Sequence, residues 1–253
     1  METPKQHFPN TNVLDPITIG PLPVSPKAYE DALDEFLEIY AKRPFVDNKG
    51  GMSSAHLFYA WFMAKWIAPS HIIESGVFQG QGTWFFEQAC PNAKIICLEP
   101  RSEKINYISE KAAYATADFG KIDWTDYLGE NIKNTLCFFD DHQDAAPRLQ
   151  TAKRYGFKHL MFEDNYPINQ GDCISLKKLL ETKAGQADVV RNHIESYYEF
   201  PPIAKSSHTR WGDEWISPDY PTHSPLLTEY SDKYKTYFDD AQDYTWISYV
   251  RLP

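Results

Sequence analysis

The chain of 253 residues contains no apolar run of about 18 residues, the length at which a hydrophobic stretch becomes a candidate membrane-spanning helix. Its first residues also lack the short apolar stretch of a secretory signal, so we expect a cytoplasmic protein with no membrane partner. Basic residues are few: 25 Lys and Arg stand against 35 Asp and Glu, which gives a net charge of −10. A nucleic-acid partner is not expected either, because its phosphates need a basic face.

Cysteine is scarce, and the spacing of the four cysteines excludes common cysteine-based sites. No two of them form a C-x-x-C pair, and Cys97 and Cys137 lie inside apolar runs typical of strands. We therefore expect buried, reduced thiols rather than disulfides or a zinc site. Aromatic residues, by contrast, make up 15% of the chain, which suits either a site that stacks on sugars and rings or a large core.

From residue 71 onward, short apolar runs alternate with amphipathic stretches. The apolar runs predict strands at 71–75, 94–98, 134–139 and 158–162, with a weak candidate inside 119–126. The other stretches predict helices at 82–90, 102–114, 143–155 and 175–182. This alternation predicts an α/β fold with a Rossmann-like, doubly wound and mostly parallel sheet. The carboxyl ends of the parallel strands then meet at one edge, where ligands bind.

The segment before this alternation predicts an arm and two covering helices, which together form residues 1–70. Residues 1–24 are rich in proline and predict an extended arm. Pro26 suits the first position of a helix, and Ser53 or Ser54 suits the cap of a second one. Both helices are expected to pack on the sheet or to cover its ligand-binding edge.

Residues 71–253 are predicted to form the main domain, although their last third is less regular. Residues 188–200 predict a helix, and residues 244–252 alternate like a terminal edge strand. Residues 201–225 are too long for a simple connection. They are either a loop that covers a substrate or an irregular ordered excursion.

A glycine-rich turn follows the first predicted strand, in the sequence His71-Ile-Ile-Glu-Ser-Gly-Val-Phe-Gln-Gly-Gln-Gly82. Gly76, Gly80 and Gly82 give the spacing G-x-x-x-G-x-G, which differs from the dinucleotide pattern G-x-G-x-x-G. If Gly80 began the dinucleotide pattern, Phe85 would occupy the third glycine position and block the approach of a pyrophosphate. The turn therefore favours a ligand other than a dinucleotide.

Two acids next to this turn narrow the choice of ligand. Glu74 directly precedes the turn and suits a ligand that carries an ammonium group, whereas Glu99 ends the next strand and suits two ribose hydroxyls. Together they indicate S-adenosylmethionine. The residues expected to bind this cofactor are Glu74, Gly76, Gln79, Gly80, Gln81, Glu99, Pro100, Arg101 and Asp126.

Acids also follow the two later strands, at residues 140–144 and at 163–164. The ends of neighbouring strands lie about 5 Å apart, so carboxylates from both would converge on one point. Such a cluster repels itself unless it holds a cation, and an all-oxygen set suits a hard ion such as Mg²⁺ or Ca²⁺. Alternatively, these acids only cap the helices that follow them.

His142 follows Asp140 by two residues and belongs to the same sheet edge. A histidine titrates near neutral pH and can take a proton from a hydroxyl, so His142 is the candidate general base. The alternative is an ordinary surface histidine in a loop.

With these motifs in place, the chain resembles the class I S-adenosylmethionine-dependent methyltransferases. Within that class it is most similar to metal-dependent O-methyltransferases of the cephalosporin hydroxylase-like and macrocin O-methyltransferase-like groups. The resemblance covers roughly residues 48–182. It rests on four motifs: Glu74-Ser-Gly-Val-Phe-Gln-Gly-Gln-Gly, Cys97-Leu-Glu-Pro, Phe139-Asp-Asp-His and Met161-Phe-Glu-Asp-Asn-Tyr.

The resemblance implies a divalent ion, such as Mg²⁺, held by Asp140, Glu163 and Asp164, with Asn165 as an alternative ligand. It also implies that a histidine at the position of His142 acts as the base. The run Asp140-Asp141-His142 departs from the usual Asp-Gly/Ser-Asp/His of those groups, which leaves open which aspartate is the ligand.

Motifs and resemblance together predict an S-adenosylmethionine-dependent O-methyltransferase that acts, with metal assistance, on a hydroxyl of a sugar or small natural product. Two alternatives stay open: a metal-independent methyltransferase whose acids are only caps, and a cofactor-binding interaction module without turnover. Residues 183–253 match no known pattern, so they do not identify the acceptor. A homo-oligomer is compatible with this interpretation.

Overall fold

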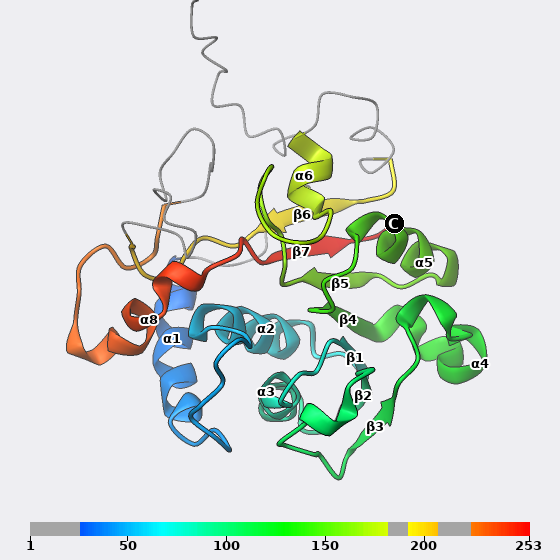
Figure 1. The fold of residues 1–253 in the computed structure, drawn as a ribbon, viewed down its shortest axis with the longest axis horizontal. Coiled ribbons are helices and arrows are strands. Elements are labelled where there is room, and N and C mark those ends of the chain that lie inside the picture. Colours follow the sequence, from blue (N-terminus) through cyan, green and yellow to red (C-terminus); the bar gives the residue numbers. More distant parts are fainter. Residues whose placement is uncertain (1–25, 182–191, 207–223) are drawn as a thin grey trace, which may run out of the picture.

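A seven-stranded sheet runs through the computed structural model of the protein, which describes residues 26–181, 192–206 and 224–253 (Figure 1). The predicted arm at residues 1–24 and most of the predicted loop at residues 201–225 lie outside the described residues. Among the residues described, no helix has the length and apolar character that a bilayer crossing requires.

The strands of the sheet follow the order β3-β2-β1-β4-β5-β7-β6, and Figure 1 shows them stacked from β6 at the top to β3 at the bottom. The strands from β3 to β5 are parallel, whereas β7 is antiparallel to both of its neighbours. The bounds are β1 His71–Ser75, β2 Lys94–Leu98, β3 Ala112–Ala115, β4 Thr135–Phe139, β5 His159–Phe162, β6 Ser196–Glu199 and β7 Ser248–Arg251. The predicted α/β fold is confirmed, and this strand order is typical of class I methyltransferases.

Helices cover both faces of the sheet. One face packs against α1 (Pro26–Tyr40), α2 (Ser54–Ile67), α3 (Gln81–Ala89) and α8 (Lys235–Asp239). The other face packs against α4 (Trp124–Leu128), α5 (Ala145–Tyr155) and α6 (Leu176–Glu181). Short 3₁₀ helices lie at Ser102–Lys104, Phe119–Lys121, Gly129–Asn134, Asp232–Tyr234 and Ala241–Asp243.

The central strands read as unbroken apolar runs because both of their faces are buried. Ile72 points into the core beneath α2 and α3, while Ile73 points into the core beneath α4 and α5. The same alternation continues in β4 and β5, which is why these strands were predicted to within one residue at each end. All four cysteines are free and buried, as predicted.

The helix predicted at 102–114 is wrong. Only Ser102–Lys104 forms a turn of 3₁₀ helix, and Ala112–Ala115 forms β3, whose residues pair with β2 from Ile95 onward. Pairing with the neighbouring strand overrides the helical propensity of an alanine-rich segment. The weak strand inside 119–126 is also wrong, because Asp118 and Asp123 cap two short helices there.

Two predictions near the C-terminal end of the sheet also fail. In the stretch predicted as a helix at 188–200, Ser196–Glu199 forms β6, and residues 188–191 lie outside the described part. The strand predicted within 244–252 exists as β7, but it lies between β5 and β6 rather than at an edge. The stretch alternates in sequence like an edge strand, yet Ser248 and Tyr249 are buried.

Candidate functional site

The carboxyl ends of β1 and β4 meet at the point where the strand order reverses direction. Gly76 follows β1 with a φ of 89°, and a Cβ atom on it would lie 2.0 Å from the carbonyl oxygen of Asp140. Only glycine therefore lets the ends of the two strands approach this closely. In open α/β sheets this reversal point is where ligands bind.

A cavity of about 340 Å³ lies at this edge, within the usual size range of ligand sites. Gly50 and Gly51, in the loop before α2, also line it. An adjoining cavity of about 470 Å³ shares Glu99 with the first and extends along the end of β3. Of the predicted cofactor-binding residues, those that line the first cavity are Gly76, Glu99, Pro100 and Arg101.

Glu99 lies between the two cavities and is held by the backbone. One carboxylate oxygen accepts hydrogen bonds from the N–H groups of Val77 (3.1 Å) and Phe78 (2.9 Å), and the other accepts from Arg101 (2.9 Å). Burial alone would raise the pKa of Glu99, but these three N–H groups hold it below its ordinary value. The side chain is therefore an ionised acceptor fixed at the cavity.

Glu74, by contrast, does not line either cavity. Its carboxyl is buried, and one oxygen accepts from the Thr83 hydroxyl and the Cys97 thiol, whereas the other has no hydrogen-bond partner among the described residues. Burial raises the pKa of Glu74 to about 8, so the group is mostly protonated at neutral pH. In this arrangement Glu74 contacts α3 and β2 rather than the space in which a ligand would lie.

The remaining predicted cofactor residues do not line the cavities. Gly80 caps α3 with a φ of 88°, close to the backbone of Tyr107. The side chain of Gln79 accepts from Asn106 and that of Gln81 donates to the backbone of Phe45, so both hold loops in place. Asp126 is exposed on α4 and is not among the residues that line either cavity.

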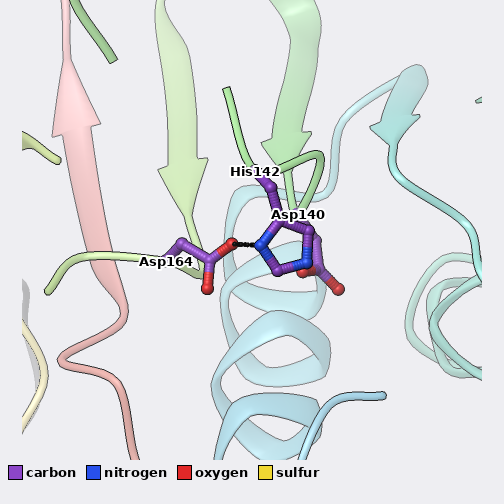
Figure 2. A group of neighbouring side chains, drawn as sticks. All are labelled: Asp140, His142 and Asp164. Carbon is purple, nitrogen blue, oxygen red and sulfur yellow. Dashed lines mark ion pairs between the residues drawn. The ribbon is translucent and has the colours of Figure 1, made fainter. Parts of the chain in front are cut away.

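Three side chains gather beside the first cavity: Asp140, His142 and Asp164, with ligand atoms within 4.8 Å of one another. Figure 2 shows the His142 ring between the two carboxylates, with an ion pair of 3.1 Å from its Nδ1 to an oxygen of Asp164. That oxygen is buried, and the imidazole is its charged partner. Burial, together with the neighbouring Glu163 carboxylate, raises the pKa of both Asp140 and Asp164 well above the ordinary value.

This arrangement fits a divalent cation. Asp140 and Asp164 lie close to each other and to a third carboxyl, Glu163, so a cation between them would offset their mutual repulsion. Two carboxylate oxygens and one imidazole nitrogen are donors that divalent metals accept. Asp140 lines the cavity as well, so the metal group and the cavity share a wall.

Glu163, predicted as a ligand, is paired elsewhere. Its carboxylate lies 2.9 Å from Nδ1 of His56, a residue of α2. The backbone N–H of Thr245 donates to Nε2 of the same ring at 3.0 Å, so Nδ1 carries the proton that faces Glu163. Although burial would raise it, His56 holds the pKa of Glu163 low, at about 2.

The alternative ligands that the sequence left open are also engaged. Asn165 accepts from the backbone N–H of Lys177 and donates to the Tyr197 hydroxyl and to the carbonyl of Trp246. Asp141 pairs with Arg148 at 2.9 Å. Among the aspartates after β4, Asp140 is therefore the one that faces the metal group.

Several residues at the site were not predicted. Asp118 lines the cavity from the loop after β3, and it was missed because β3 itself was assigned to a helix. Arg148 lies on α5 and also lines the cavity. Asp172 places a carboxylate oxygen 3.2 Å from Nδ1 of His142. Nothing in the sequence pattern distinguishes these charged residues from others on the surface.

No family model matches the chain, and no curated protein matches it. Solved structures do resemble it. A putative O-methyltransferase from Klebsiella pneumoniae is 10% identical, with a TM-score of 0.46 over 91% of each chain. An O-methyltransferase from Bacillus cereus in complex with SAH is 10% identical, with a TM-score of 0.43 over 92% of this chain and 93% of that one.

A further solved structure is the O-methyltransferase TomG from Streptomyces achromogenes, involved in tomaymycin synthesis, in complex with SAM. It is 8% identical, with a TM-score of 0.47 over 88% of this chain and 89% of that one. At such low identities the likeness concerns the fold alone and says nothing about substrates or residue roles.

Proposed function

We propose that this protein is an S-adenosylmethionine-dependent O-methyltransferase that uses a divalent metal ion. The observation that carries the proposal is the shared wall at Asp140, which belongs both to the cavity and to the metal-competent group with His142 and Asp164. A methyl donor and a metal-bound acceptor would then meet at one sheet edge. The solved structures with a similar fold include O-methyltransferases.

The cofactor would occupy the cavity between β1, β2 and β4. Glu99 is an ionised acceptor with its orientation already fixed, which suits the two hydroxyls of a ribose. Gly76 lines this cavity and lets the ends of β1 and β4 approach each other beside it. Holding donor and acceptor in contact supplies much of the rate of such a transfer, because their encounter is no longer bimolecular.

Asp140 and Asp164 would hold the ion, which would lower the pKa of a bound acceptor hydroxyl. His142 is the proposed base. Its Nδ1 faces Asp164 and Asp172, so Nε2 is the nitrogen left to accept a proton. The φ of His142, 54°, is unusual for a non-glycine residue and sets the direction of the ring.

The acceptor is proposed to be a sugar or a small polyhydroxylated natural product. The net charge of −10 and the acids around the site disfavour an anionic substrate. One observation favours a metal-independent methyltransferase as the second candidate: the Asp164 carboxyl is ion-paired with His142.

Two experiments test the proposal. Calorimetry should show that S-adenosylhomocysteine binds, and a panel of hydroxylated acceptors with labelled S-adenosylmethionine should give a methylated product. Exhaustive chelation should abolish turnover, and Mg²⁺ should restore it. Asp140→Asn should lose this metal response, whereas Asp123→Asn, a cap substitution on α4 away from the site, should keep it.

Each failure has its own meaning. If S-adenosylhomocysteine does not bind, the proposed activity is refuted. If turnover survives chelation, the metal-independent alternative replaces it. Binding without any product across the panel would favour an interaction module.

A further inference from the structure

A buried arginine connects two loops at the cavity. Arg148, on α5, has a side chain that is only 6% exposed. Its two terminal nitrogens donate to the two carboxylate oxygens of Asp118, at 3.0 and 2.6 Å. Its Nε and one terminal nitrogen contact an oxygen of Asp141, at 3.1 and 2.9 Å. We call these three residues the arginine clamp.

The clamp spans strands that are not neighbours. Asp118 follows β3 and Asp141 follows β4, and both β2 and β1 lie between these strands in the sheet. At about 4.8 Å per strand, β3 and β4 are roughly 14 Å apart. The loop after β3 must therefore fold across the ends of the two central strands to reach Arg148.

All three members of the clamp line the first cavity. The hydroxyl of Ser75, at the end of β1, donates to Asp141 at 2.5 Å and ties a third strand end to the same group. The rings of Phe119 and Phe139 lie 5.9 and 5.8 Å from the guanidinium carbon. The guanidinium is thus fixed by three hydrogen bonds, one further ion-pair contact and two rings, so the cavity wall is set in advance.

Lysine could not replace this arginine with the same effect. A planar guanidinium can bind one carboxylate with two nitrogens while it contacts a second one, whereas an ammonium is a single point charge. Without the cation, Asp118 and Asp141 would repel each other, and Asp141 would be free to turn toward Asp140. The clamp therefore keeps one aspartate out of the metal group.

We propose that Arg148 is a positioning residue for the cofactor, which holds residues 116–118 and 141–143 as the wall against which the nucleoside lies. This rests on the proposed function, because it presumes a nucleoside next to Glu99. The two loops flank Glu99 in the cavity, so they are the surfaces that a base attached to that ribose would contact.

The test measures binding rather than turnover. Calorimetry with S-adenosylhomocysteine and with adenosine alone should show at least tenfold weaker binding to Arg148→Met. Arg154→Met is the matched control, since Arg154 lies exposed on the same helix, packs over the Tyr155 ring and does not line the cavity. It should bind both ligands as the wild type does. Thermal unfolding checks that each variant is folded at the temperature of the assay.

Arg148→Lys covers the case in which Arg148→Met fails to fold. It keeps the positive charge but loses the fork, so adenosine should still bind several-fold more weakly than to the wild type. Wild-type affinity in either folded Arg148 variant would overturn the positioning role. If the wild type itself binds neither ligand, the proposed function fails, and the clamp loses its cofactor role with it.

Discussion

The buried carboxyl of Glu74 predicts how the stability of the protein depends on pH. Its pKa rises from an ordinary value of 4.5 to about 8 on folding, because burial disfavours the charged form. A carboxyl with a raised pKa stabilises the fold fully below its unfolded pKa and loses that contribution as the pH rises through its folded pKa. The loss therefore occurs between about pH 4.5 and pH 8.

The size of the effect follows from the shift. A rise of the pKa from 4.5 to about 8, at about 1.4 kcal/mol for each tenfold change in proton affinity, amounts to roughly 5 kcal/mol over the whole range. Between pH 5 and pH 8 most of this, about 3–4 kcal/mol, should be lost from the wild type. Glu74→Gln keeps the shape of the side chain and an acceptor for Thr83 but cannot ionise.

Denaturant unfolding at pH 5, 6, 7 and 8 measures the free energy of unfolding of both proteins. Other groups titrate equally in each, so the difference between the two curves isolates Glu74. From pH 5 to pH 8, we expect the free energy of unfolding of the variant to rise by about 3–4 kcal/mol relative to that of the wild type. Parallel curves would refute the reasoning and would mean that Glu74 is ionised in the fold.

Three further predictions concern the site. Glu99→Ala removes a fixed anionic acceptor, whose hydrogen bonds to ribose would each be worth about 1.5–3 kcal/mol. Calorimetry should therefore show S-adenosylhomocysteine bound at least tenfold more weakly, and unchanged affinity would exclude Glu99 as the ribose ligand. Asn165→Asp places a carboxylate against the Trp246 carbonyl and should lower the free energy of unfolding by about 2–3 kcal/mol. It should not tighten metal binding, and tighter binding of the metal by a stable variant would make residue 165 a ligand. His142→Ala should lower the methyl-transfer rate by about 10²–10⁴-fold while affinity for S-adenosylhomocysteine stays near that of the wild type; a variant that keeps most of its rate would show that His142 is not the base.

The central strands could be predicted because their burial on both faces produces apolar runs. The peripheral strands could not. β3 has no buried residue, so its composition gives no apolar run, and it is a strand only because β2 offers a partner. β6 alternates between buried and half-buried residues, and it pairs only with β7, a strand far away in the sequence.

The candidate site, like the fold, has features that could be predicted from the sequence and features that could not. Acids at the ends of β4 and β5 could be predicted to converge, because parallel strands end at one edge, and Asp140 and Asp164 do so. Glu163 lies beside them but forms an ion pair with His56, on a helix more than a hundred residues earlier in the chain. Such long-range pairing leaves no local pattern in the sequence, so the order of ligands within an acidic run could not be read from it.

Asp140 lines the proposed cofactor cavity and also belongs to the proposed metal group, so its charge links the binding of the cofactor to the binding of the ion. The sulfonium of S-adenosylmethionine and a divalent ion would both draw on the same carboxylate, so each weakens the attraction available to the other. Methyl transfer would remove the charge on sulfur. The neutral product would then no longer compete with the ion for the Asp140 carboxylate. By reciprocity, the ion would favour the neutral product over the charged donor by the same factor. In the proposed reaction, a single aspartate would thus make product release depend on the concentration of the metal.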